Sequence, residues 1–281
     1  RIQKLKSLRK EINARELEIH EALKQDMRKP TFEAMTSETV LVDKELSLMI
    51  KMLPLWNKTR RAKSSLINFP SKDYIKPEPF GNTLMISPWN YPFQLAITPL
   101  IGAVAAGNTV VLKPSEYAPH TSGVIQKIIR NVFDSGHVSV LEGDSTVASE
   151  LLKKRWDFIM FTGSTRVGKI IAKAAALHLT PTTLELGGKS PCVVDDSAPI
   201  GITAKRIVWG KFLNCGQTCI APDYLLVNEK IKSKLVTAIT KEIERAFGKN
   251  QKKSDDYGRI AHVNHFKKLK MAIKGEQVIY G

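Results

Sequence analysis

Cysteine is scarce in this sequence of 281 residues, and aromatic side chains make up only 7% of it. The three cysteines, Cys192, Cys215 and Cys219, are too few and odd in number for a disulfide framework, which favours a reducing compartment such as the cytoplasm. A chain of this length can bury a sizeable core without disulfides or metal, and at roughly 100–200 residues per domain one or two domains are expected. The charged, helical pattern of residues 1–28 does not resemble a signal peptide.

Long hydrophobic runs are also rare. Residues 91–112 carry no charge, and the length of this stretch would permit a membrane span. The stretch is interrupted, however, by Pro92, Pro99, Gly102 and the pair Gly107-Asn108. It therefore predicts a buried helix, a turn at residues 106–108 and a buried strand at 109–112, not a membrane span.

Acidic residues are outnumbered, since 43 Lys and Arg against 27 Asp and Glu give a net charge of +16 and a pI near 9.7. Such a charge is compatible with nucleic acid or an anionic membrane as a partner. The basic residues form only short clusters, at 58–63, 153–155 and 267–270, and these are expected to be solvated faces. The charge also fits attraction of a dinucleotide phosphate.

The chain does contain a regular order of elements. Residues 1–57 have apolar side chains at helical spacing, whereas 58–82 are mixed, extended and rich in proline, which indicates an arm or linker. Strands are predicted at 83–87, 109–112, 139–142, 158–162 and 182–186. They alternate with helices at 93–106, 121–132, 145–153 and 165–177. This alternation predicts an α/β fold with a doubly wound parallel sheet, whose strand-end loops meet at one edge.

A second unit is predicted after Gly187. It has strands at 190–194 and 224–227, helices at 204–212 and 230–247, and a further strand at 277–280. No internal repeat and no low-complexity tract is present.

The segment 214–219, Asn-Cys-Gly-Gln-Thr-Cys, could hold a nucleophile. The thiolate is the attacking form, so a reactive cysteine needs surroundings that lower its pKa, and the glycine allows the backbone to approach a substrate closely. Composition alone favours two buried structural cysteines. The spacing is a poor zinc signal, because no second Cys/His pair stands nearby.

The segment 161–168, Phe-Thr-Gly-Ser-Thr-Arg-Val-Gly, follows an apolar strand and opens a helix, as a phosphate-binding turn does. Free N–H groups and the dipole at a helix N-terminus favour anions. Thr165 stands where the Rossmann fingerprint has its middle glycine, so an ordinary strand-to-helix turn is an equal alternative.

Three further loops carry polar side chains. Glu185 ends an apolar strand before two glycines, so partly dry surroundings and the role of a general base are expected, with an ion pair to a lysine as the alternative. Asn90, in Ser-Pro-Trp-Asn-Tyr-Pro, could donate to an oxyanion or cap the next helix. Lys113, in Lys-Pro-Ser-Glu, could reach a ribose or phosphate, although the loop alone is unremarkable.

Taken together and in order, the motifs Pro-Trp-Asn-Tyr-Pro, Lys-Pro-Ser-Glu, Phe-Thr-Gly-Ser-Thr, Glu-Leu-Gly-Gly-Lys and Gly-Gln-Thr-Cys resemble those of the NAD(P)-dependent aldehyde dehydrogenases. Residues 179–185 and 219–224 are most similar to the class 3 branch. The resemblance extends over the whole chain and is strongest from 81 to 224. It implies a Rossmann-like cofactor domain made of N-terminal helices 1–57 and residues 83–187, an oligomerisation arm at 58–82, and part of an α/β catalytic domain at 188–281.

The resemblance also implies catalytic roles. Cys219 matches the nucleophile that forms a thiohemiacetal and then a thioester. Asn90 and the backbone N–H of Cys219 match the donors to the oxyanion, and Glu185 matches the residue that activates water. Cys215 is expected to be a neighbour of the site and Cys192 a core residue.

For the cofactor, the resemblance implies NAD or NADP, with Lys113 and Glu116 near the adenosine ribose and Gly163 and Ser164 beside the pyrophosphate and nicotinamide. The cofactor-binding residues expected in full are Trp89, Lys113, Glu116, Gly163, Ser164 and Gly168. Gly188 is expected at the domain junction. No metal is implied. The substrates expected are medium-chain aliphatic or aromatic aldehydes, and the assembly expected is a homodimer.

One departure is the lack of the later Glu-x-Phe-Gly-Pro motif of the family, so we expect the protein to continue beyond Gly281. Some class 3 members carry a C-terminal membrane anchor, which these residues do not include. Two alternatives stay open. One is an acylating or acyl-reducing relative that uses the same cysteine, and the other is a non-enzymatic basic module that binds nucleic acid in a salt-dependent way.

Overall fold

Short apolar runs between turns form a parallel sheet of five strands in the computed structural model, which describes residues 1–281. The strands are β3 (Asn82–Ile86), β4 (Thr109–Lys113), β5 (Val138–Val140), β6 (Phe158–Gly163) and β7 (Thr182–Leu186). Their order across the sheet is β5-β4-β3-β6-β7. The chain therefore builds outward from β3 to one side and then returns to build the other side. The crevice between β3 and β6 is thus the topological switch point, where open α/β sheets bind ligands.

Helices cover both faces of the sheet, because the central strands β3, β4 and β6 carry apolar side chains on both sides. On one face Met85 packs against α5 (Gln94–Ala106) and α6 (Pro119–Val132). On the other, Leu84 and Ile86 pack against α8 (Thr165–Ala176), and α7 (Ser145–Leu152) completes that layer. The predicted doubly wound α/β fold is therefore confirmed.

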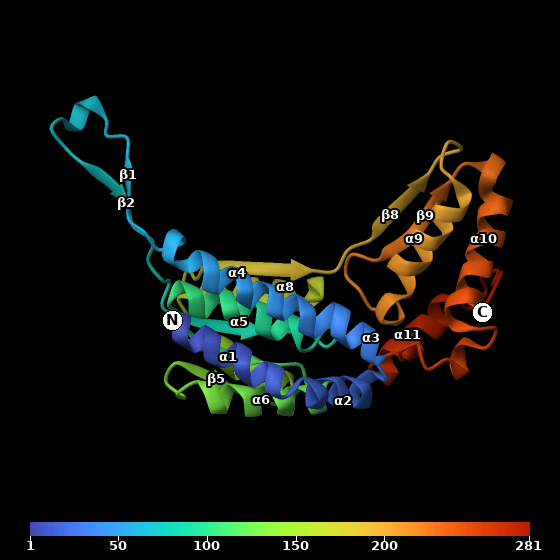
Figure 1. The fold of residues 1–281 in the computed structure, drawn as a ribbon, viewed down its shortest axis with the longest axis horizontal. Coiled ribbons are helices and arrows are strands. Elements are labelled where there is room, and N and C mark those ends of the chain that lie inside the picture. Colours follow the sequence, from blue (N-terminus) through green and yellow to red (C-terminus); the bar gives the residue numbers. More distant parts are fainter.

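The N-terminal helices thicken the first layer (Figure 1). They are α1 (Ile2–Ala14), α2 (Glu16–Met27), α3 (Thr31–Ala34) and α4 (Val40–Trp56), with a π-helical stretch η1 (Met35–Thr39) between α3 and α4. Leu5, Leu8, Leu23 and Leu46 are fully buried in the same core cluster as α5 and α6. The helical spacing seen in residues 1–57 is therefore the spacing of a face that packs on the sheet layer.

An antiparallel hairpin follows α4 and projects from one end of the molecule (Figure 1). It consists of β1 (Arg60–Ala62), a 3-10 turn η2 (Leu66–Asn68) and β2 (Asp73–Ile75). Leu66 is 90% exposed and Ile67 94% exposed, so the tip shows apolar side chains to solvent. The role of residues 58–82 as an oligomerisation arm stays a prediction.

A smaller unit lies at the other end (Figure 1). Its elements are β8 (Ser190–Val194), α9 (Ile200–Phe212), the 3-10 turn η3 (Leu213–Gly216), β9 (Pro222–Val227), α10 (Glu229–Phe247), the 3-10 turn η4 (Gln251–Lys253) and α11 (Val263–Ala272). Strands β8 and β9 pair in parallel, and α9 and α10 pack against them through Ile207 and Leu235. Helix α9 begins four residues before the predicted start.

The predicted strand at 277–280 is wrong. No strand pairs with these residues, and the Tyr280 hydroxyl instead contacts Gln251 at 2.9 Å and Glu244 at 3.3 Å. The uncharged stretch 91–112 forms α5 and the start of β4, separated by Gly107 in a left-handed turn (φ 100°), as predicted. None of the helices combines the length and the apolar character that crossing a bilayer requires.

Candidate active site

The carboxyl ends of the central strands bring the polar motifs to one edge of the sheet. Ile86 is in register with Lys113 on β4 and with Phe161 on β6, and Thr162 is in register with Glu185 on β7. The loops after β3, β4 and β6 therefore begin at the same level. Parallel pairing thus gathers four motifs that are far apart in the sequence.

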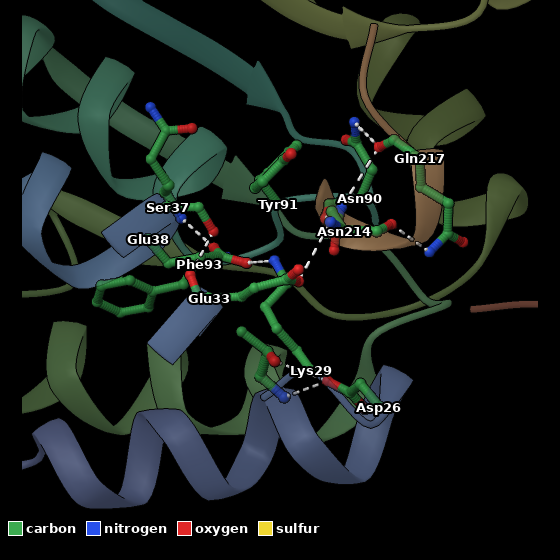
Figure 2. A network of polar contacts seen from close by, with 12 residues as sticks. Asp26, Lys29, Glu33, Ser37, Glu38, Asn90, Tyr91, Phe93, Asn214 and Gln217 are labelled. Carbon is green, nitrogen blue, oxygen red and sulfur yellow. Dashed lines mark hydrogen bonds and ion pairs between the residues drawn. The ribbon is translucent and has the colours of Figure 1, made fainter. Parts of the chain in front are cut away.

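Asn90, in the loop after β3, is joined directly to the turn that precedes Cys219 (Figure 2). Its side-chain Nδ2 donates to the carbonyl of Gln217 at 2.9 Å, and its own carbonyl accepts from Nδ2 of Asn214 at 2.7 Å. The Gln217 side chain in turn donates to Asn214 and Arg259, both at 3.0 Å. An amide carries two N–H groups, so Asn90 keeps one for another acceptor.

The backbone of this turn is unusual. Asn214, Cys215 and Gly216 have φ values of 55°, 56° and 75°, so three successive residues are left-handed. Asparagine and glycine tolerate this conformation, whereas cysteine does so at a cost of about 1–3 kcal/mol. A Cβ at Gly216 would lie 3.1 Å from the carbonyl oxygen of Lys211, a tight contact that adds to the preference for glycine set by φ.

Tyr91 holds the residue beside the candidate nucleophile. Its hydroxyl lies 2.5 Å from Oγ1 of Thr218. Burial raises the pKa of Tyr91 to about 12, so the hydroxyl stays protonated near neutral pH. Cys219 itself is exposed, and a Cβ at Gly188 would lie 3.6 Å from its carbonyl oxygen. Gly188 thus lies beside the loop that carries the candidate nucleophile.

The other two cysteines differ from Cys219. Burial raises the pKa of the Cys215 thiol, which is hydrogen-bonded to Tyr257, so this cysteine of the turn stays protonated near neutral pH. Cys192 packs beside the smaller core of the β8–β9 unit but is only half-buried, so the expectation of a core residue holds in part.

Glu185 does not lie in the partly dry surroundings expected from its sequence. Its side chain is exposed on β7, because residues at alternate positions of this strand face opposite sides and only Thr182, Leu184 and Leu186 are partly covered. No hydrogen bond or ion pair joins it to Cys219 or to a lysine. The expectation was wrong because an apolar strand buries only the positions that a neighbouring layer covers.

The turn after β6 has the features of an anion site. Ser164 caps α8, accepting from Val167 N–H at 3.4 Å, and its side chain is exposed. A Cβ at Gly163 would lie 2.5 Å from the buried ring of Phe161. Gly168 is buried, and a Cβ there would lie 2.7 Å from Leu186 on β7. Gly168 therefore lets α8 pack closely on the sheet, as the last glycine of a dinucleotide-binding turn does.

Lys113 and Glu116 form one unit in the loop after β4. The Lys113 ammonium, almost fully buried, donates to Glu116 at 2.8 Å and to the carbonyl of Pro114 at 3.2 Å. In this arrangement the carboxylate of Glu116 is more accessible than the ammonium of Lys113. A direct reach of Lys113 to a ribose would require the ion pair to open.

Helix α11 and the residues before it also return to this edge. The Trp89 ring meets His265 with 4.5 Å between centroids, and Tyr117 meets His262 at 4.3 Å. No pattern in the sequence indicated that residues 262–265 lie here, since the helix has a weak apolar pattern and several lysines.

Three buried charges in the segment 29–38 were likewise not predicted from the sequence. Lys29 and Glu38 are fully buried and 2.5 Å apart, and Glu33 accepts the backbone N–H of Asn214 at 3.1 Å (Figure 2). Burial raises the pKa of Glu33, while the Asn214 N–H and Lys29 lower it in part. Charged residues in a helical segment normally predict a solvated face, so composition and periodicity could not have identified them.

Known proteins are similar to this chain over its whole length. Residues 1–278 match the profile of the aldehyde dehydrogenase family. A 4,4'-diaponeurosporen-aldehyde dehydrogenase of Staphylococcus aureus is 44% identical, aldehyde dehydrogenase family 3 member A2 of Macaca fascicularis 43%, and the dimeric NADP-preferring aldehyde dehydrogenase of Canis lupus familiaris 43%. All of this chain is covered in each case, and it spans 62%, 58% and 62% of their respective lengths.

A solved structure gives the same result. The substrate-bound state of Staphylococcus aureus AldH superposes with a TM-score of 0.94 at 44% identity, covering 97% of this chain and 60% of that one. The similarity therefore includes both the five-stranded sheet and the β8–β9 unit.

Proposed function

This chain belongs to the aldehyde dehydrogenase family, with relatives in its class 3 branch, and on that premise we propose that the natural protein oxidises an aldehyde to a carboxylic acid through Cys219. Asn90 is the proposed donor to the oxyanion and Glu185 the proposed activator of water. Because the chain spans about 60% of the length of its relatives, the activity is proposed for the whole protein that contains it.

The proposed reaction begins when the Cys219 thiolate attacks the carbonyl carbon and forms a C–S bond. The oxygen becomes an oxyanion, which the free N–H of Asn90 and the backbone N–H of Cys219 stabilise. One such donor is typically worth about 10²–10³ in turnover. NAD or NADP, bound at the edge of the sheet, would supply the acceptor for the hydride of this carbon, and loss of that hydride converts the adduct on Cys219 to a thioester. Glu185 takes a proton from water, whose oxygen displaces the thiolate and releases the acid.

One observation carries this proposal, the pair of hydrogen bonds between Asn90 and the turn 214–217. These bonds hold the Asn90 amide, which has a second N–H available for substrate, next to the loop that bears the exposed Cys219. Glu185 lies at the same edge of the sheet, but its contact with water and substrate is inferred from the family alone.

The residues at the switch point fit a dinucleotide. A side chain at Gly163 would meet the buried ring of Phe161, so the close packing of this turn on β6 requires glycine. The first N–H groups of α8, a helix of twelve residues, suit a pyrophosphate. Glu116 would accept ribose hydroxyls, with Trp89, Ser164 and the Lys113–Glu116 pair beside it. Gly168 would act indirectly, by setting the distance between α8 and the sheet.

We expect a homodimer, in the cytoplasm, acting on medium-chain aliphatic or aromatic aldehydes. The exposed apolar tip of the arm supports assembly, because isolated hairpins are marginally stable alone. One relative is named as dimeric and NADP-preferring, and another is named for a diaponeurosporen aldehyde. Free cysteines fit a reducing compartment.

The proposal is tested by replacing Cys219 and Cys215 in the natural full-length protein. Reduction of NAD or NADP with hexanal and with benzaldehyde is followed by absorbance, and the product is identified by mass spectrometry. Cys219→Ala should abolish cofactor reduction and Cys215→Ala should retain it, with free acid as the product. Full activity of Cys219→Ala would exclude this nucleophile, and a thioester product would indicate an acylating enzyme instead.

A further inference from the structure

We propose that Glu33 is a positioning residue that holds the nucleophile loop in its reactive conformation from the N-terminal helices. The role rests on the proposed function of Cys219, but it concerns a residue that contacts neither substrate nor cofactor. Glu33 and its partner in the loop, Asn214, are 181 residues apart in the sequence.

The contact is made at the point of the loop where the backbone is left-handed. Glu33 Oε2 accepts the N–H of Asn214, a residue that is 2% exposed. The same residue donates its amide to the carbonyl of Asn90. Asn214 is thereby held from two sides, by a carboxylate on α3 and by the loop after β3 (Figure 2).

Glu33 can act as an anchor because the segment that carries it is itself fixed. Glu38, five residues later in the π-helical stretch, accepts the N–H groups of Phe93 and Gln94 at 3.0 and 2.9 Å. Its other oxygen binds Lys29, whose ammonium lies 4.4 Å from the ring centroid of Tyr91. The segment 29–38 is therefore fixed against the start of α5. From this fixed segment Glu33 contacts Asn214 of the second unit.

The consequence is that one short segment contacts both loops of the site. It fixes the first turn of α5, just after Asn90, and the first left-handed residue of the turn that leads to Cys219. Reacting groups must be held to within a fraction of an ångström for efficient turnover. A hydrogen bond that the Asn214 N–H donates to a buried carboxylate limits the freedom of a loop whose cysteine is exposed.

The test compares Glu33→Ala with Glu33→Gln in the natural full-length protein. Alanine removes the acceptor, whereas the carbonyl of glutamine can still accept the Asn214 N–H. Glu33→Ala should lower kcat about 10- to 100-fold, the range for loss of one charge-assisted hydrogen bond, with a smaller change in KM. Glu33→Gln should retain most of the wild-type kcat.

A matched control is Asp157→Asn. Asp157 also accepts a backbone N–H from a distant element, Asn82 at 2.8 Å, but it lies at the amino ends of the strands, opposite the site. Its replacement should leave kcat unchanged. If Glu33→Ala is insoluble, Glu33→Asp takes its place, since the shorter side chain withdraws the acceptor and keeps the charge.

A second readout does not depend on activity. Hydrogen–deuterium exchange of the peptide containing residues 213–219 should be faster in Glu33→Ala than in wild type, while exchange in α8 stays the same. An unchanged kcat in Glu33→Ala, or unchanged exchange of this peptide, would overturn the proposal. If the wild type oxidises no aldehyde, the proposed function fails, and the exchange measurement alone decides whether Glu33 positions the loop.

Discussion

Replacing Glu38 by glutamine should destabilise the protein far more than replacing an acidic residue at the surface. Both partners of the Lys29–Glu38 pair are 0% exposed, and Glu38 also accepts two backbone N–H groups at the start of α5. Glutamine can still accept those N–H groups, but it removes the carboxylate that pairs directly with the buried ammonium of Lys29. The perturbation is therefore a nearly isosteric removal of one charge.

The magnitude follows from the burial. Removing one partner of a buried ion pair typically costs about 3–5 kcal/mol, because an uncompensated charge is left in a poorly solvated place. For a domain of roughly 150–250 residues, 1 kcal/mol lowers Tm by about 2–4 °C. We therefore expect Glu38→Gln to lower Tm by about 6–20 °C.

The assay is thermal unfolding followed by circular dichroism, with Asp43→Asn as the control. Asp43 pairs with Arg9 at 2.6 Å, but the two side chains are 36% and 42% exposed. A surface pair of this kind is worth about 0–1 kcal/mol, so the control should lose at most a few degrees. The two variants remove the same kind of contact at nearly the same distance and differ mainly in burial.

The double variant Lys29→Met/Glu38→Gln separates the charge from the packing. It removes the unpaired ammonium and should recover part of the lost Tm. A loss in Glu38→Gln no larger than that in Asp43→Asn would show that the buried charge is not what matters. The same conclusion would follow if the double variant were less stable than the sum of the two single variants predicts.

Two further predictions concern packing and pH. Gly163→Ala should lower the free energy of unfolding by about 1–3 kcal/mol, because the added methyl would meet the buried ring of Phe161. Gly123→Ala, in open space on α6, should raise it by about 0.5–1 kcal/mol. Shifts of Tm in opposite directions would confirm both expectations. The pKa of Glu18 is lowered, chiefly by the hydrogen bond from Lys127. Glu18 therefore stabilises the folded state at pH values above the ordinary pKa of a glutamate. This stabilisation is lost as the pH falls from the ordinary pKa through the lowered one. Tm measured from pH 7 down to about pH 3 should therefore show Glu18→Gln below wild type at neutral pH and approaching it in acid, and a constant difference would contradict the assignment.

The sheet and its edge could be predicted from the sequence because both depend on local pattern. Apolar runs separated by helical spacing specify alternating strands and helices, and parallel pairing then places the strand-end loops together. Asn90 and Gly163 could thus be expected at one edge from the order of the strands, whereas Cys219, in the second unit, was placed with them only by the family resemblance. The strand at 277–280 was predicted wrongly because a short apolar run cannot be assigned without knowing whether a partner strand exists.

The supports of the site could not be predicted in this way. Lys29, Glu33 and Glu38 have no signal in composition, since the same residues on an amphipathic helix are usually solvated. Their burial depends on contacts 55 to 181 residues away in the sequence. The sequence also could not predict that Glu185 is exposed, because its exposure depends on which faces of β7 are covered by other layers. Long-range packing decided these positions.

The left-handed turn at 214–216 limits how freely residues 188–281 can be exchanged between family members. Asn214 and Cys215 adopt a conformation that an isolated segment would leave, and the contacts that hold it come from α3 and from the loop after β3. A chimera that joined residues 188–281 to a different sheet would carry the nucleophile without the groups that shape its loop. Recombination between distant family members should therefore succeed only when residues 29–38, 90–91 and 214–219 all come from the same parent.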